Sequence, residues 1–192
     1  MPIYDYVELI LIFIRPYLFK NISLPSHSSV IDIACGTGFM TSLFAQKGYI
    51  VTAVDLSPEM LNKAKDKLKK FTNITYYLGS ASQLPFKDDE FDASSISFAL
   101  HDMPYEMGAD VLREMIRTTK SGGKIYIIDY NTSLPTFEMK IGHLLCSIWE
   151  SIYYKDFLKR GIDAYLVDPS LKLVKSNKFL FSNVAYLEYV KT

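Results

Sequence analysis

The chain has few of the residues that cross-link small proteins, and it has no excess of charge of either sign. Only two of its 192 residues are cysteines, Cys35 and Cys146, and they lie far apart. The absence of a CxxC pair or a Cys/His cluster argues against a disulfide framework and a structural zinc site. Lys plus Arg equals Asp plus Glu, at 21 each. Because nucleic-acid phosphates select a basic surface, we expect no nucleic-acid partner.

Long hydrophobic runs are also missing. The most apolar stretch near the N-terminus, Leu9–Ile14, is six residues long and is bounded by Glu8 and Arg15. A helix needs about 20 apolar residues to cross a bilayer, and no signal-peptide pattern accompanies this run. We therefore expect a buried N-terminal helix, no membrane span and a cytoplasmic protein. A helix lying on a membrane surface is the alternative.

Neither internal repeats nor proline-rich linkers divide the chain, so we expect a single domain over residues 1–192. Short apolar runs alternate with amphipathic segments, which is typical of βαβ units around a parallel sheet. The predicted fold class is therefore α/β, with a doubly wound, Rossmann-like sheet. Its first five strands are predicted at residues 30–34, 49–55, 74–78, 91–98 and 124–129.

The last two strand-like runs, 171–181 and 184–190, are joined by only Ser182 and Asn183. So short a connection requires an antiparallel hairpin, because a parallel partner would need a crossover. The sequence thus predicts a seven-stranded sheet that is mostly parallel, with an antiparallel C-terminal hairpin. We divide the domain into an N-terminal helical cap (1–27), a cofactor-binding core (28–131), a helical insertion (132–170) and the terminal hairpin (171–192).

A glycine-containing loop, Asp32-Ile33-Ala34-Cys35-Gly36-Thr37-Gly38-Phe39, follows the first strand. Ligands of doubly wound sheets bind beyond the carboxyl ends of such strands, where glycine lets the backbone approach closely. Asp55 ends the next strand, where a carboxylate can accept both hydroxyls of a ribose. The dinucleotide fingerprint GxGxxG requires a small third residue where this chain has Thr41, which disfavours NAD.

Four segments in order resemble the motifs of class I S-adenosylmethionine-dependent methyltransferases, close to the branch of the ubiquinone/menaquinone-biosynthesis methyltransferases. They are Ile31–Gly38, Val54–Leu61, Gly79–Phe86 followed by Phe91-Asp92, and the turn Lys120–Lys124. The resemblance spans residues 28 to 131. It is specific for the fold and the cofactor, and it says almost nothing about the methyl acceptor.

The resemblance implies that S-adenosylmethionine is the cofactor. The backbone of 34–38 would hold its methionine end, Asp55 its ribose, and Leu56 and Met60 its adenine. The family usually has Asp where this chain has Ser80, so the contact with the adenine amino edge loses a carboxylate. The complete predicted cofactor-binding set is Asp32, Ala34, Cys35, Gly36, Gly38, Asp55, Leu56, Met60, Ser80, Ala81 and Ser97.

Methyl transfer from a sulfonium is an in-line displacement with a neutral leaving group, so holding the acceptor in line supplies most of the acceleration. A base matters when the nucleophile must lose a proton. His101, after the fourth strand, is the candidate, and its neighbour Asp102 is a carboxylate that could orient it. Asp102, Asp129 and Asn131 could instead bind Mg²⁺. The four motifs match a metal-free branch better, so we expect no metal.

The acceptor is expected to be a small molecule, apolar or aromatic. The N-terminal helix and the late insertion are the segments available to form a lid over it, with His101 and Tyr154 near the methyl group. Aromatic candidates for the lining are Tyr4, Tyr6, Trp149, Tyr153 and Tyr154. Two alternatives stay open: a domain that binds the cofactor without activity, and an NAD-dependent reductase.

Overall fold

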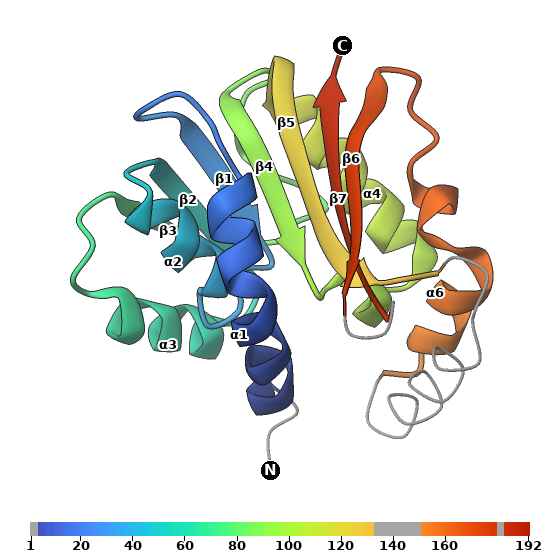
Figure 1. Ribbon diagram of the computed structural model, residues 1–192, viewed down its shortest axis with the longest axis horizontal. Coiled ribbons are helices and arrows are strands. Elements are labelled where there is room, and N and C mark those ends of the chain that lie inside the picture. The colour runs from blue at the N-terminus through green and yellow to red at the C-terminus, as the bar shows by residue number, and fades with distance from the viewer. Residues whose placement is uncertain (1–3, 133–150, 180–182) are drawn as a thin grey trace.

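The computed structural model describes residues 4–132, 151–179 and 183–192, and the side chains of its first helix from Phe13 onward. One seven-stranded sheet crosses the molecule in the order β3-β2-β1-β4-β5-β7-β6. Figure 1 shows this sheet with helices on both faces. The strands are β1 (Ser29–Ile33), β2 (Ile50–Asp55), β3 (Ile74–Leu78), β4 (Phe91–Ser97), β5 (Thr119–Tyr130), β6 (Leu171–Phe179) and β7 (Val184–Lys191).

The strand directions confirm the predicted fold class. β1 pairs in parallel with β2 and β4, β2 with β3, and β4 with β5. β7 enters between β5 and β6 and is antiparallel to both. The strand order reverses at β1, whose neighbours β2 and β4 belong to the two halves of the sheet. This reversal is where doubly wound sheets bind ligands.

The helices are α1 (Tyr4–Asn21), α2 (Phe39–Gln46), α3 (Pro58–Leu68), α4 (Tyr105–Thr118) and α6 (Tyr154–Arg160), with 3-10 turns η1 (Leu100–Asp102) and η2 (Ile162–Tyr165). Alternating side chains of the strands build two cores. Val30 packs with α1 and α2 on one face, whereas Ile31 and Ile33 pack with α4, α6 and η2 on the other. α3 joins the first face, where Leu61 meets Ala53.

One predicted boundary is wrong. The sequence suggested that Gly122 and Gly123 lie in a turn before a strand beginning at Lys124, but β5 begins at Thr119. Phe91 pairs with Thr119 and Ala93 pairs with Lys124, so the turn is an insertion within the strand. A Cβ on Gly123 would lie 2.7 Å from the carbonyl oxygen of Lys120. Only glycine fits this irregularity, which a linear pattern does not distinguish from a turn.

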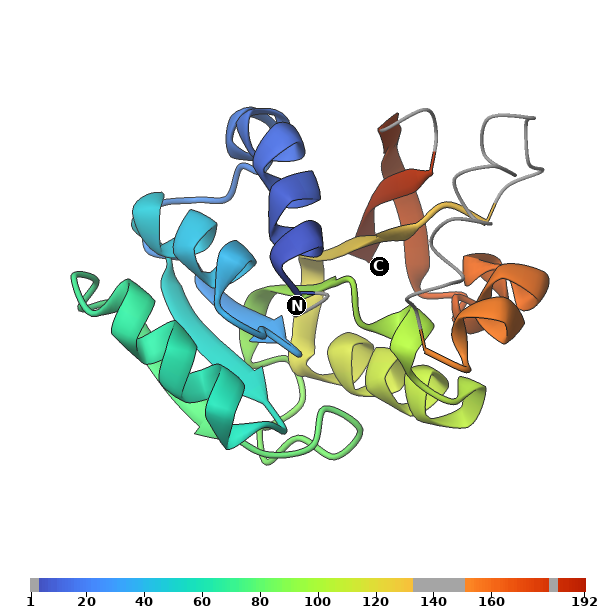
Figure 2. The same ribbon diagram turned by 90° about the horizontal axis from the view of Figure 1, so that it is seen from below.

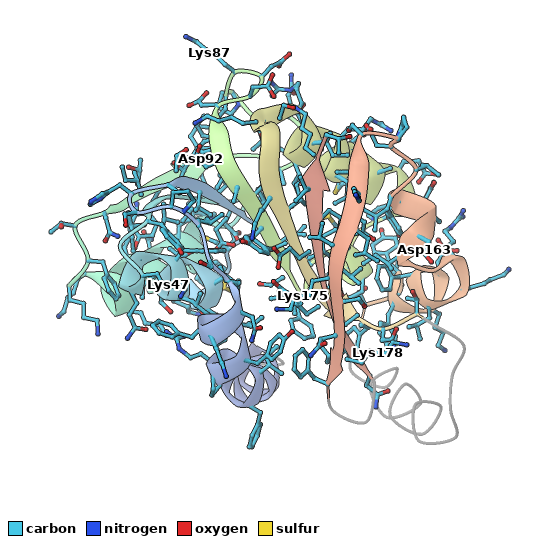
Figure 3. All side chains as sticks on the ribbon, turned by 45° about the horizontal axis from the view of Figure 1, so that its top comes forward. Lys47, Lys87, Asp92, Asp163, Lys175 and Lys178 are labelled. Carbon is cyan, nitrogen blue, oxygen red and sulfur yellow. The ribbon has the colours of Figure 1, made fainter. Side chains whose placement is uncertain are left out.

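The N-terminal helix is part of the core over its second half. Ile14, Leu18 and Ile22 are almost completely buried against α2 and the sheet. Lys175 of β6 donates a hydrogen bond to Asn21 Oδ1 at 2.6 Å, which ties α1 to the opposite end of the chain. Figure 3 shows Lys175 directed toward α1. The second half of α1 is therefore a fixed part of the core.

The two helices that flank the predicted lid segments, α1 and α6, lie on opposite faces of the sheet (Figure 2). The N-terminal end of α1 projects past the edge at which β4 ends, and α6 lies on the other face of the sheet (Figures 1 and 2). Residues 133–150, which include Trp149, lie outside the described residues, as do the side chains of Tyr4 and Tyr6. Among the residues that are described, no helix is long and apolar enough to cross a membrane.

Candidate active site

The loop after β1 has an unusual backbone. Ala34, Gly36 and Gly38 all have positive φ, at 51°, 55° and 86°. A positive φ costs energy for any residue with a Cβ, and such strain concentrates at ligand sites. A Cβ built on Gly36 meets no atom within 4 Å. The backbone at Gly36 therefore faces open space that a ligand can occupy, which fits the predicted cofactor.

Gly38 is required for a different reason. A Cβ there would lie 2.7 Å from Leu68 Cδ1 and 3.3 Å from Ala64 Cβ, both on α3. The two glycines of the loop thus have different structural roles. Gly36 leaves room on the outside, and Gly38 lets the start of α2 pack closely against α3.

Asp55 fastens the loop to the second strand. Its Oδ2 accepts a hydrogen bond from the backbone N–H of Gly36 at 2.7 Å, and its Oδ1 accepts one from the N–H of Ser57 at 2.9 Å. A carboxylate has about four acceptor positions, so these two bonds leave capacity for two further donors. The half-buried side chain can therefore accept ribose hydroxyls while it holds the loop.

Asp32 lies behind the loop and is completely buried. Its carboxylate accepts hydrogen bonds from Thr41 Oγ1 and Ser95 Oγ, each at 2.5 Å. Burial raises the pKa of the Asp32 carboxyl to about 6, although both hydroxyls oppose the rise. Thr41 was missed as a site residue, even though it stands where a dinucleotide loop has its third small residue. Its hydroxyl ties the start of α2 to β1.

The remaining predicted cofactor residues differ in accessibility. Leu56 is exposed, and Met60, Ser80, Ala81 and Ser97 are half-buried. Ser80 Oγ lies 2.8 Å from Ser82 Oγ. Cys35 is buried, and its thiol pKa is raised, first by desolvation and then by Asp32 and Asp55, so the thiol stays protonated.

His101 lies in η1, directly after β4, and only 2% of its surface is exposed. Its Nδ1 is 2.6 Å from Asp129 Oδ1, at the end of β5. Its Nε2 is 3.7 Å from Asp102 Oδ2, beyond hydrogen-bond distance. Asp129 is therefore the carboxylate within hydrogen-bond distance of His101, whereas sequence-adjacent Asp102 lies farther away, at ion-pair distance from Nε2. The pairing of β4 with β5 brings Asp129 to the histidine, and sequence spacing alone does not reveal it.

Aromatic rings surround the histidine. Tyr130 and Tyr154 lie edge-on to the His101 ring, with centroids 4.8 and 6.0 Å away, and Phe98 and Phe157 stand 6.4 and 6.3 Å away. Tyr154, the second residue predicted to lie near the methyl group, is completely buried. The structure thus brings His101 and Tyr154 together, on the α6 side of the sheet.

Of the three residues considered as magnesium ligands, Asp102 comes no nearer than 3.7 Å to His101 Nε2, Asp129 is hydrogen-bonded, and Asn131 is hydrogen-bonded through its backbone. Asp129 binds His101, and the backbone N–H of Asn131 donates to Asn183 O at 2.8 Å. Within residues 4–132, 151–179 and 183–192, no group of three or more His, Cys, Asp or Glu side chains is arranged to hold a metal.

A reversal of strand order at β1, an open glycine loop after it and a carboxylate closing β2 define a domain that binds a nucleoside-containing cofactor. A family model described as a methyltransferase domain matches residues 31–127. The chain belongs to this family, the S-adenosylmethionine-dependent methyltransferases, and S-adenosylmethionine is its cofactor.

Curated relatives also resemble the chain. A demethylmenaquinone methyltransferase of Paenarthrobacter aurescens is 34% identical over 135 residues, covering 70% of this chain and 47% of the relative. A ubiquinone/menaquinone biosynthesis C-methyltransferase of Vibrio vulnificus is 36% identical over 116 residues, covering 57% and 43%. The chain spans about half the length of the curated relatives it matches.

Solved structures support the fold. A protein of Pyrococcus horikoshii superposes with a TM-score of 0.75 at 20% identity, covering 98% of this chain and 92% of that chain. At this level of identity the similarity is one of fold alone.

Proposed function

We propose that the protein transfers a methyl group from S-adenosylmethionine to a small-molecule acceptor by in-line displacement. The observation that carries this proposal is the open backbone at Gly36 with Asp55 bonded beneath it. When bound, the cofactor supplies an electrophilic methyl group on a sulfonium. The chain's own contribution is to hold the cofactor at β1 and β2 and to present the acceptor from the β4 and β5 side.

The cofactor contacts that we propose divide into two sets. Gly36, Asp55 and Leu56 offer accessible backbone, carboxylate and apolar surface, and Met60, Ser80, Ala81 and Ser97 complete the set around them. Asp32, Cys35 and Gly38 are buried behind the loop, and their part is to hold its shape. Ser80 offers a neutral hydroxyl at the position that we assign to the adenine amino edge, so this contact carries no charge.

For the acceptor we propose a ring of the quinone type, because the relatives are named for demethylmenaquinone and for ubiquinone/menaquinone biosynthesis. The ring would react in its reduced form, since a hydroquinone is electron-rich enough to attack a methyl carbon and a quinone is not. The aromatic side chains around His101 support this proposal, because they suit a flat apolar ring. His101 and Tyr154 are the two residues that we assign to the acceptor.

Transfer of a deuterated methyl group from labelled S-adenosylmethionine to reduced demethylmenaquinone, followed by mass spectrometry, tests the function. The product is expected to gain one labelled methyl group on carbon. S-adenosylmethionine binding without transfer to this ring or to simpler phenols would favour the inactive cofactor-binding domain instead.

A further inference from the structure

The connection between β3 and β4, residues 79–90, crosses the sheet without a helix. Because β3 and β4 point in the same direction, it runs from the carboxyl end of one strand back to the amino end of the other. From Ser80 to Asp88, its only backbone–backbone hydrogen bond within the described part of the chain joins Gln83 N to Ser80 O, at 3.4 Å. Other groups must therefore satisfy and hold the backbone of this segment.

Two side chains on one turn of α4, Glu114 and Arg117, hold the middle of the segment, and we call them the α4 clamp. Glu114 Oε2 accepts the N–H of Leu84 at 2.7 Å. Arg117 Nη2 donates to the carbonyl oxygen of Leu84 at 3.1 Å, and its Nη1 donates to that of Phe86 at 2.8 Å. Both backbone groups of Leu84 are thus bonded to α4, and its side chain is buried in the core.

The remaining donors of Arg117 are also used. Nε and Nη2 donate to the two carboxylate oxygens of Glu114, at 2.7 and 2.8 Å, and Nη1 donates to Asp88 Oδ1 at 2.8 Å. A guanidinium has five N–H groups in one plane, and all five have acceptors here. The ammonium of a lysine has three donors on a single nitrogen and cannot make this set. The hydrogen bond from Arg117 also lowers the pKa of the Glu114 carboxyl, so the clamp is an ion pair at neutral pH.

The turn from Ser80 to Gln83 lies directly before the clamped Leu84. Its first end is fixed because the N–H of Gly79 donates to the carbonyl oxygen of Asp55 at 3.0 Å. Its second end is fixed because the α4 clamp bonds both backbone groups of Leu84. The position of the turn relative to Asp55 therefore depends on the clamp.

We infer that the α4 clamp is a pair of positioning residues that gives the site its preference for an adenine base. By holding Leu84, the clamp fixes where Ser80 and Ala81 lie beside the base. Arg117 has no donor left for a ligand, so it acts through the segment. The inference rests on the proposed assignment of Ser80 and Ala81 to the adenine amino edge. The amino group is a donor, whereas hypoxanthine has a carbonyl oxygen in its place, so a correctly placed turn distinguishes the two bases.

Calorimetric titration with S-adenosylhomocysteine and with S-inosylhomocysteine, in which hypoxanthine replaces adenine, measures this preference. For the wild-type protein we expect the adenine compound to bind about tenfold more tightly, the effect of one mispaired polar group. Arg117→Lys should reduce this ratio to about twofold or less, because the planar set of five donors is lost. Both affinities are measured on one variant, so any loss of folded protein cancels in the ratio.

Two further variants support the comparison. Glu114→Gln keeps the shape of the side chain but replaces one acceptor oxygen by a donor, so the preference should fall in the same direction. Arg113→Lys is the matched control, because Arg113 lies on the exposed face of the same helix and pairs with Asp110. It should leave the ratio within about twofold of the wild-type value, as expected for an exposed ion pair.

Hydrogen exchange of residues 79–88, followed by mass spectrometry, tests the clamp without any ligand. We expect exchange to be at least about tenfold faster in Arg117→Lys and unchanged in Arg113→Lys, because local opening follows the bonds that hold a segment. Unchanged exchange in Arg117→Lys, or a preference for adenine that survives this substitution, would overturn the inference alone. A wild-type protein that binds both compounds equally would overturn the proposed adenine contact together with the inference.

Discussion

Asp55 is the last residue of β2 and Asp129 the last but one of β5, at the same edge of the sheet, and each accepts two backbone N–H groups. Asp55 is half-buried and holds a glycine loop that faces open space. Asp129 is buried among aromatic rings and holds a histidine. The two halves of the edge therefore differ: the β1–β2 half presents open backbone and a half-buried carboxylate, whereas the β4–β5 half holds a histidine against a buried carboxylate.

The largest effect is expected from a side chain that fills the open space at Gly36. Gly36→Val places a branched side chain where we expect the cofactor to contact the backbone of the loop. We expect the affinity for S-adenosylmethionine, measured by calorimetry, to fall at least about 100-fold, or roughly 2.7 kcal/mol.

Gly48→Val is the matched control for this substitution. Gly48 also has a positive φ, at 82°, and a Cβ there also meets nothing within 4 Å. Both variants therefore carry similar backbone strain, but only the Gly36 variant should lose binding. Equal losses in the two variants would show that strain, and not a blocked site, is responsible.

The second prediction concerns Asp32, the buried carboxylate behind the loop. Its pKa is about 6 in the folded protein against 3.8 for the free group. Between pH 4 and 6 the Asp32 carboxyl is ionised in the unfolded chain but still protonated in the folded protein. The folded state is therefore destabilised relative to the unfolded chain as the pH rises through this range. This loss of stability is complete about one pH unit above the folded pKa, where the carboxyl of the folded protein is also ionised.

Asp32→Asn removes this titration. The free energy of unfolding of the variant minus that of the wild type should therefore rise by roughly 2 kcal/mol between pH 4 and pH 7. One unit of pKa shift is worth about 1.4 kcal/mol, and the carboxyl of the unfolded chain is already more than half ionised at pH 4. Urea unfolding at the two pH values measures the difference. A constant difference would mean that Asp32 is already ionised at pH 4 in the folded protein.

The third prediction tests the ribose contact. Asp55→Ala should weaken S-adenosylmethionine and S-adenosylhomocysteine alike by roughly 1–3 kcal/mol, the range for lost hydrogen bonds to a charged acceptor. Asp92→Ala is the control, because Asp92 Oδ2 also accepts a backbone N–H, from Ser29 at 2.8 Å. Figure 3 shows Asp92 at the opposite edge of the sheet. Binding that is indifferent to Asp55, or equally sensitive to Asp92, would contradict the assignment.

The smallest expected effect on cofactor binding comes from shortening the lid. Removing residues 1–11 keeps Ile14, Leu18 and Ile22, which belong to the core. We expect the affinity for S-adenosylmethionine to stay within about threefold, while transfer to reduced demethylmenaquinone falls more steeply. A loss of cofactor affinity as large as the loss of transfer would place the first half of α1 on the cofactor side.

The β1–β2 half could be predicted from the sequence because its determinants are local. A few consecutive residues are enough to recognise each of its features: the loop 34–38, Asp55 and the helix N-cap at Ser57. The structure confirms the N-cap, because Ser57 Oγ accepts a hydrogen bond from the N–H of Met60. The seven strands and the hairpin followed from patterns of the same kind.

The β4–β5 half could not be predicted in this way because its contacts are long-range. Asp129 and His101 are 28 positions apart and meet only because β4 and β5 are neighbours. The same holds for Ser95, whose hydroxyl reaches Asp32 across 63 positions. Sequence proximity favoured Asp102, and only the strand order reveals Asp129.

Calorimetric titration of the wild-type protein with S-adenosylmethionine, and separately with NADH, tests the central claim that the β1–β2 half holds this cofactor. The account predicts saturable binding of S-adenosylmethionine with one site per chain, and no binding of NADH at the same concentrations. Binding of NADH, or no heat of binding with S-adenosylmethionine, would contradict it.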